Sequence, residues 1–215
     1  SEIVARSPIR PVQPVIERGW EVTALRLAAP LTLVDLAPSA KVHVRADRDG
    51  VMANALGVAF GRAARDDTGA LVIGSGPGEW LVLGPLGSQH EVRSRLRSMA
   101  TEGAELVSVI DLTHGRALMR LTGSRAPDVL AKVCGIDFGD AATPNGTALR
   151  SSVAKLVTDV VRDDQGSDGQ GSDGRLVRSY LLHCERSSGQ YLFDAMLDAG
   201  AEFEICVGGF PSPQA

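Results

Sequence analysis

The chain repeats its own pattern of predicted elements, and this repeat constrains the fold more than any single motif. Apolar periodicity predicts the order β-α-β-β-α-β over residues 31–111 and the same order again over 112–207. Residues 51–64 (VMANALGVAFGRAA) align without gaps on 129–142 (VLAKVCGIDFGDAA), with seven of fourteen positions identical. The chain is therefore predicted to be an α+β protein, built as a tandem duplication of a ferredoxin-like βαββαβ unit.

Local patterns place individual elements within these repeats. Apolar residues at helical spacing over residues 51–56 predict a helix, and Gly57 is typical of a helix end. The segment Gly74–Gly78 separates two predicted strands. Because a strand follows this segment, and not a helix, we expect a hairpin turn and not a phosphate-binding loop.

Residues 1–30 precede the repeats and are predicted to form an extended, proline-rich arm. Pro8, Pro11 and Pro14 recur at every third position, which excludes a helix. The arm also carries apolar side chains that a disordered tail does not need, so we expect it to dock on its own body or on a partner. The candidate contact residues are Ile9, Pro11, Val12, Pro14 and Trp20.

A Gly-rich acidic segment interrupts the second repeat. Residues 163–175 contain the sequence QGSDG twice and no apolar side chain, so a disordered loop is predicted there. Asp163 and Asp164 are interpreted as a solvated charge pair at its start. The segment lacks the ligand spacing and the closing Glu of a calcium loop. Residues 208–215 are predicted to form a tail.

Charge and composition exclude several classes of function. The formal net charge is −4, and no basic cluster marks a nucleic-acid partner. No apolar run is long enough to span a membrane. Three cysteines at wide spacing fit neither a disulfide framework nor a zinc site, so no metal site is predicted. A cytoplasmic location is expected.

The densest polar group of the chain consists of Asp111, His114 and Arg116, between two predicted strands. Such a group can bind a ligand or transfer protons. The competing interpretation is a turn in which Asp111 accepts backbone N–H groups while Arg116 lies on an exposed strand face. No nucleophile is coupled to the group, so no catalytic residue is predicted.

Several segments resemble the gamma subunit of heterotetrameric sarcosine oxidase. They are residues 76–83 (GPGEWLVL), 111–137 (DLTHGRALMRLTGSRAPDVLAKVCGID), 178–182 (RSYLL) and 186–197 (RSSGQYLFDAML). The resemblance spans about residues 31–207 and keeps the order of the motifs. That family is related in fold to the folate-binding aminomethyltransferases, which are themselves built from paired ferredoxin-like units.

The resemblance implies a complex of alpha, beta, gamma and delta chains that oxidises the N-methyl group of sarcosine. Glycine, hydrogen peroxide and either formaldehyde or methylenetetrahydrofolate are the products. FAD, FMN, NAD and tetrahydrofolate belong to the alpha and beta chains of that family, and zinc to delta. The resemblance therefore implies a non-catalytic gamma subunit that carries no cofactor and packs chiefly on the alpha subunit, which it stabilises.

Two alternatives stay open. One is a stand-alone folate-binding protein of one-carbon transfer, which would bind folate with Asp111, His114 and Arg116. The other is the equivalent subunit of a complex that oxidises another N-methyl amine. The aminomethyltransferases carry a glycine and two consecutive acidic residues in the strand after the second-half helix. Here Asp159 stands alone without that glycine, which weighs against folate catalysis.

Overall fold

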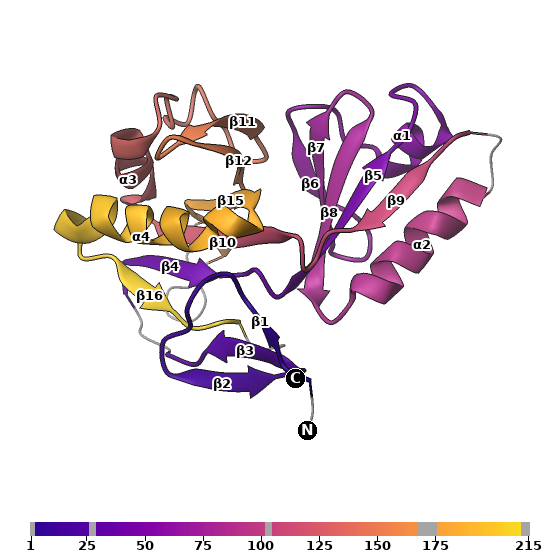
Figure 1. Ribbon diagram of the computed structural model, residues 1–215. Coiled ribbons are helices and arrows are strands. Elements are labelled where there is room, and N and C mark those ends of the chain that lie inside the picture. The colour runs from indigo at the N-terminus through magenta and orange to yellow at the C-terminus, as the bar shows by residue number, and fades with distance from the viewer. Residues whose placement is uncertain (1–2, 26–28, 102–104, 167–175, 212–215) are drawn as a thin grey trace.

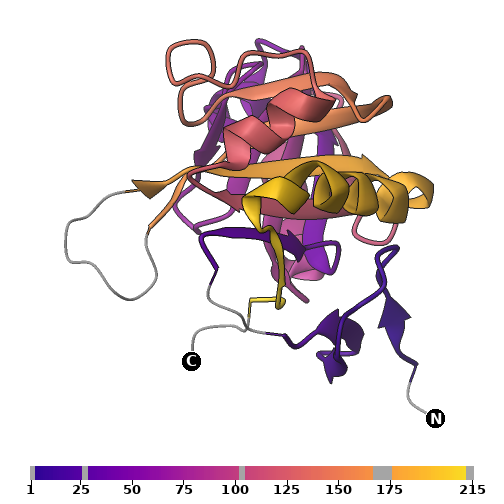
Figure 2. The ribbon, with the colours of Figure 1, turned by 90° about the vertical axis from the view of Figure 1, so that its left-hand side faces the viewer.

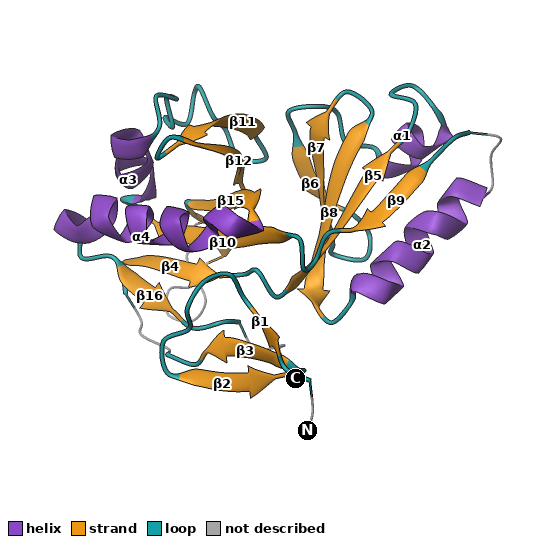
Figure 3. Ribbon diagram, in the orientation of Figure 1, coloured by secondary structure: helices purple, strands orange, loops and turns teal. Residues whose placement is uncertain are grey.

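The computed structural model describes residues 3–25, 29–101, 105–166 and 176–211. Two β-sheets lie face to face, with helices on their outer faces and a small third sheet near the N-terminus (Figure 1). Figure 3 shows the same layers by secondary structure: helix, sheet, sheet, helix. The predicted α+β class is therefore confirmed.

The first sheet is antiparallel throughout. Its strands, in spatial order, are β6 (Ala63–Arg65), β7 (Leu71–Gly76), β8 (Glu79–Leu86), β5 (Ser39–Arg45) and β9 (Ser108–Asp111). Helices α1 (Val51–Leu56) and α2 (Gln89–Thr101) cover its outer face, where Val42, Val82 and Leu96 are fully buried. The predicted helix over 51–56 and the hairpin between β7 and β8 are both confirmed.

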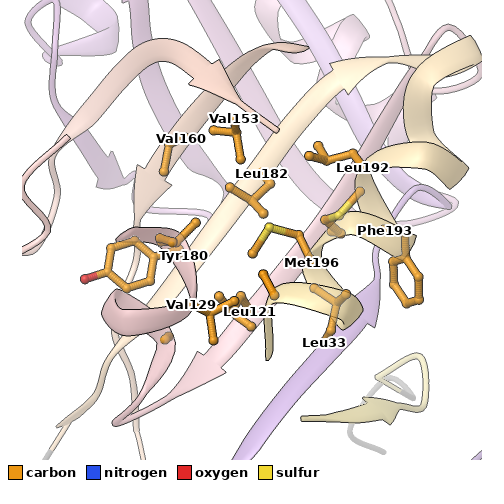
Figure 4. Packing of buried hydrophobic residues seen from close by; sticks show 14 of the residues in the cluster. Leu33, Leu121, Val129, Val153, Val160, Tyr180, Leu182, Leu192, Phe193 and Met196 are labelled. Atoms are coloured by element: carbon orange, nitrogen blue, oxygen red, sulfur yellow. The ribbon is translucent and has the colours of Figure 1, made fainter. Parts of the chain in front are cut away.

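The second sheet is larger. Its strands, in spatial order, are β11 (Ala148–Val153), β12 (Leu156–Arg162), β15 (Ser179–Glu185), β10 (Arg116–Gly123), β4 (Leu31–Asp35) and β16 (Cys206–Gly208). Helices α3 (Ala126–Val133) and α4 (Gly189–Gly200) cover its outer face. Leu182 from the sheet and Met196 from α4 are fully buried in the core between them (Figure 4). The remaining elements are short: β13 (Gln165–Gly166), β14 (Leu176–Val177), η1 (Arg186–Ser188) and η2 (Ala201–Phe203).

Strand β4 lies in a different sheet from the one that its sequence position suggested. Residues 31–111 were predicted to form one repeat, but β4 pairs with β10 and β16 in the second sheet. Leu31 and Leu33 are fully buried there, in the core beneath α3 and α4. Alternation along a strand shows that one face is buried, but it does not show which sheet supplies the partner. The chain therefore crosses between the sheets at residues 36–38.

The N-terminal arm packs on the body of the protein. Strands β1 (Ala5–Arg6), β2 (Pro14–Glu17) and β3 (Trp20–Thr23) form the small third sheet, in the order β1-β3-β2. In Figure 2, as in Figure 1, this N-terminal part of the chain lies below the second sheet. Ile9 is 1% exposed in the core near α4, and the Trp20 ring stacks on His114 with 4.6 Å between the ring centroids. The prediction that Ile9 and Trp20 contact a partner is thus wrong, because the chain itself already covers their apolar surface.

The two sheets meet through an apolar layer on their inner faces. Members come from both sheets: Leu71, Ile73, Leu81 and Leu83 from the first, and Leu118, Ala148, Val161 and Leu181 from the second. These are alternate positions along their strands, so the opposite faces remain free for the helices. This inner layer joins the two halves of the chain into one body.

The start of the predicted disordered loop is ordered instead. Residues 167–175 of that segment lie outside the described residues, but Asp163 and Asp164 are only 12% and 7% exposed. Asp163 pairs with Arg120 and Arg65, and Asp164 pairs with Arg162. The interpretation as a solvated pair is wrong, because neighbouring strands bring buried guanidinium groups that need these carboxylates.

Two buried charged residues flank the crossing between the sheets. Lys41 is fully buried, and its Nζ donates to the carbonyl oxygens of Ala37 at 2.6 Å and Ser39 at 2.8 Å. Asp35 accepts the Ala37 N–H at 2.8 Å. Burial lowers the pKa of Lys41 to about 7 and raises the pKa of Asp35 to about 6.

These two pKa shifts predict that the free energy of unfolding depends on pH, with Lys41 and Asp35 contributing slopes of opposite sign. From about pH 7 to 10.5 unfolded Lys41 holds a proton that folded Lys41 lacks, so its contribution to stability rises with pH. From pH 3.8 to about 6 folded Asp35 holds the extra proton, so its contribution falls as pH rises. Each slope reaches at most about 1.4 kcal/mol per pH unit. Urea unfolding across pH 4–10 measures both.

The variant Lys41→Met isolates the contribution of Lys41 to stability above pH 7 from that of every other group. We expect the free energy of unfolding of this variant to rise less steeply than that of the wild type between pH 7.5 and 10. Parallel curves for the two proteins would contradict a lowered pKa for Lys41.

Candidate functional site

A pocket of about 650 Å³ lies between the two sheets, beside the apolar layer that joins them. The first sheet contributes the hairpin between β7 and β8, and the second contributes β11 and β12. Ile73, Ala148 and Val161 belong both to the pocket wall and to the inner layer. The volume falls in the range typical of small-molecule pockets.

Phe60 lies at this pocket with 65% of its surface exposed. The backbone holds it there, because Phe60 forms an isolated parallel bridge with Gly74. A Cβ atom on Gly74 would lie 2.2 Å from the Ala59 carbonyl oxygen, so only glycine permits this close approach. The exposed aromatic ring is thus a consequence of fixed backbone packing.

A row of polar and charged side chains forms one wall of the pocket and continues behind it. Arg150, Asp159 and His183 are register partners on β11, β12 and β15, so their side chains share one face of the sheet. Arg150 Nε donates to Asp159 Oδ1 at 2.6 Å, and His183 Nδ1 lies 3.2 Å from Asp159 Oδ2. Arg116 on β10 extends the row, with its Nη2 3.7 Å from Asp159 Oδ2.

Electrostatics keep Asp159 charged and His183 neutral. Burial alone would raise the pKa of Asp159, but hydrogen bonds from His183 and Arg150 outweigh it and lower that pKa to about 2. Burial lowers the pKa of His183, although its bond to Asp159 opposes this. Neutral His183 then carries its proton on Nδ1, which is the tautomer that the bond to Asp159 favours.

Two buried nitrogen atoms in this row have no hydrogen-bond partner among the described residues: Arg116 Nε and His183 Nε2. An imidazole oriented by a carboxylate is the arrangement of a general base. In the described part of the chain, however, His183 is hydrogen-bonded to Asp159 and to no hydroxyl or thiol. The bond between His183 and Asp159 thus links β15 to β12 within the sheet.

The first sheet places a second ion pair at the same pocket. Glu79 on β8 lines the pocket. Arg45 is the register partner of Glu79 on the neighbouring strand β5, and its Nη2 lies 2.8 Å from Glu79 Oε1. In both ion pairs, Arg45–Glu79 and Arg150–Asp159, the arginine is more exposed to solvent than the carboxylate. Arg45 and Arg150 are 64% and 52% exposed, whereas Glu79 and Asp159 are 28% and 14% exposed.

The predicted polar group Asp111, His114 and Arg116 does not line this pocket. Asp111 Oδ1 accepts the Thr113 N–H at 2.9 Å, as the turn interpretation expects. His114 stacks on Trp20, and Arg116 pairs with Glu185 and Asp159. Each side chain thus has its own separate contacts.

Sequence reasoning noted Asp159 only as an isolated acid and did not single out Arg150, His183 or Glu79 for this pocket. The signal that was available is polarity at inward strand positions. Arg150 is two residues from Ala148 and Asp159 is two residues from Val161, so each charged side chain shares the inward face of its strand with an apolar one. Which pocket these side chains reach depends on how the two sheets pack.

Among the described residues, no helix has both the length and the apolar character needed to cross a membrane. Within the same residues, no three His, Cys, Asp or Glu side chains are grouped so that they could hold a metal ion.

Comparisons with a family model and with curated proteins find the same family. The model of the sarcosine oxidase gamma subunit family matches residues 35–202. A sarcosine oxidase subunit gamma from Arthrobacter sp. is 31% identical over 137 residues, which are 60% of this chain and 66% of that relative, just under two thirds of its length. The subunit gamma from Corynebacterium sp. (strain P-1) is 29% identical over 164 residues, covering 73% of this chain and 76% of the relative.

Solved structures share the fold. A chain of the heterotetrameric sarcosine oxidase from Corynebacterium sp. U-96, in complex with pyrrole 2-carboxylate, superposes with a TM-score of 0.66 at 24% identity. The match covers 88% of this chain and 91% of that one. The glycine cleavage system aminomethyltransferase T from Bartonella henselae gives 0.63 at 13% identity, covering 92% of this chain and 55% of that one.

Proposed function

Because the chain belongs to the sarcosine oxidase gamma subunit family, we propose that it is a structural subunit of a sarcosine oxidase complex. The observation that carries this proposal is the family match over 168 residues, from 35 to 202. The likeness in fold to a chain of a heterotetrameric sarcosine oxidase supports it.

The complex would demethylate sarcosine oxidatively to glycine, with hydrogen peroxide and formaldehyde or methylenetetrahydrofolate as further products. Alpha, beta and delta subunits are the proposed partners, chiefly alpha, and the location is the cytoplasm. FAD, FMN, NAD, zinc and tetrahydrofolate would lie on those other subunits. The role of this chain would be to pack on the alpha subunit and stabilise it.

The surface of the N-terminal sheet is compatible with a partner contact. Val12 is 39% exposed and Ile16 is 57% exposed, and Pro14, which lies between them in the sequence, is exposed as well. Of the predicted contact set, Pro11, Val12 and Pro14 are the residues that the chain does not bury itself. We therefore keep Pro11, Val12 and Pro14 as proposed contact residues.

We also propose that the fold arose by tandem duplication of a ferredoxin-like unit. In the first half β5, β7, β8 and β9 have the spatial order β7-β8-β5-β9, with α1 and α2 as the crossovers. In the second half β10, β12, β15 and β16 have the corresponding order, with β4 inserted between β10 and β16. Equivalent orders in both halves support a common origin. The boundary of the first unit would then follow β4.

Purification of the tagged chain from its native cell extract tests the subunit role. We expect it to recover large flavin-containing chains, seen by mass spectrometry and by flavin absorbance. Extract without the tagged chain, carried through the same resin, is the control. Recovery of this chain alone and colourless would contradict the proposal.

A further inference from the structure

We propose that the pocket between the two sheets receives an apolar side chain from an acidic segment of another subunit. The partner belongs to the complex proposed above, so the role of the pocket depends on that complex. Phe60, Arg45 and Arg150 would make the contact.

The apolar part of the contact centres on Phe60. Phe60 is 65% exposed although its backbone is fixed against Gly74. The adjoining wall consists of Ile73, Leu149 and Val161. An aromatic ring beside an apolar pocket costs free energy in water, and aromatic anchors of this kind dominate binding at protein interfaces. The pocket is therefore suited to an inserted apolar side chain.

The charges at the pocket indicate what surrounds that side chain. In each ion pair the guanidinium is the more exposed member: Arg45 exceeds Glu79, and Arg150 exceeds Asp159. An approaching surface therefore meets positive charge first and negative charge only deeper in the pocket. Charge complementarity then calls for carboxylates beside the apolar anchor of the partner.

A second copy of this chain does not fit the same surface. A twofold dimer would place the same patch against itself, so the exposed guanidinium groups of Arg45 and Arg150 from both copies would gather in one interface. Facing like charges across an interface is unfavourable. A different chain with an acidic segment avoids this repulsion.

The test measures binding of the full chain to the flavin-containing subunits purified without it. We expect Phe60→Ala to weaken binding at least about 30-fold, the effect of a typical aromatic hot spot. The double variant Arg45→Gln, Arg150→Gln should bind more weakly and lose much of the dependence of binding on ionic strength.

Matched controls lie on and beyond α2, on the outer face of the first sheet. Leu106→Ala removes an apolar side chain that is 94% exposed, and Arg97→Gln neutralises an exposed guanidinium. Both should bind within about twofold of the wild type, the range expected for a rim residue. Circular dichroism and the unfolding midpoint show whether each variant folds.

The outcomes separate the two proposals. Wild-type binding that neither Phe60→Ala nor the double arginine variant weakens would overturn the docking site and leave the subunit role intact. Wild-type chain that binds no flavin-containing subunit would overturn both. A dimer of this chain, seen by light scattering and lost in Phe60→Ala, would assign the surface to a second copy and overturn the proposed partner.

Discussion

Replacing Asp163 with alanine is expected to lower the free energy of unfolding by about 3–5 kcal/mol. Asp163 Oδ2 accepts hydrogen bonds from Arg120 Nη2 at 2.7 Å and from Arg65 Nη2 at 2.8 Å. Arg120 is only 16% exposed, and burial already lowers its pKa. Without the carboxylate, a buried guanidinium on a central strand loses its counter-charge. Urea denaturation followed by circular dichroism measures the loss.

An exposed ion pair provides the control. Arg48 and Asp49 are 74% and 79% exposed, so Asp49→Ala should cost less than about 1 kcal/mol. The double variant Arg120→Met, Asp163→Ala should recover part of the lost stability, because it leaves no unpaired charge on β10. If Asp163→Ala were as mild as Asp49→Ala, the buried network would contribute little to stability.

Asp163 also shows where sequence reasoning stops. The local sequence is acidic and precedes a Gly-rich repeat, which is typical of a solvated loop. Its partner Arg120 is 43 residues away on another strand. A local pattern contains no information about a charge that arrives from so far along the chain, so the burial of Asp163 could not be predicted.

Elements whose cause is local were predicted correctly. The helix over 51–56 follows from apolar spacing, and the hairpin at Gly74–Gly78 follows from turn residues between two strands. Residues 31–35 were only assigned to the first repeat, whereas strand β4 pairs with β10 and β16, which are distant in sequence. The α+β class was therefore predictable, whereas the membership of each sheet was not.

The pocket was beyond prediction for the same reason. Phe60, Glu79 and Arg150 come from segments of both halves, and they meet only when the two sheets pack on their inner layer. Asp159 was visible as a single carboxylate in a strand. Its low pKa arises from Arg150 and His183 on the neighbouring strands, which only the register identifies.

Because β4 pairs closely with β10 at Gly123, the variant Gly123→Ala should lower the free energy of unfolding by more than about 3 kcal/mol. Gly123 ends β10 with φ of +146°, a conformation that L side chains rarely adopt. A Cβ atom there would lie 2.3 Å from the Pro30 carbonyl oxygen and 2.9 Å from Leu31 Cα. Both contacts are with backbone, so β4 must move away from β10. The free energy of unfolding in urea is the measurement.

Substitutions at two other glycines, Gly19 and Gly135, serve as controls for the destabilisation expected of Gly123→Ala. Gly19→Ala places a side chain at φ of +77° with nothing within 4 Å, so it should cost about 1–2 kcal/mol from conformation alone. Gly135→Ala meets neither strain nor a neighbour and should stay within about 0.5 kcal/mol of the wild type. The excess of Gly123→Ala over Gly19→Ala then reports the clash with β4 together with the greater strain of a φ of +146°. An excess near zero would show that β4 shifts freely, although it leads the chain from one sheet to the other.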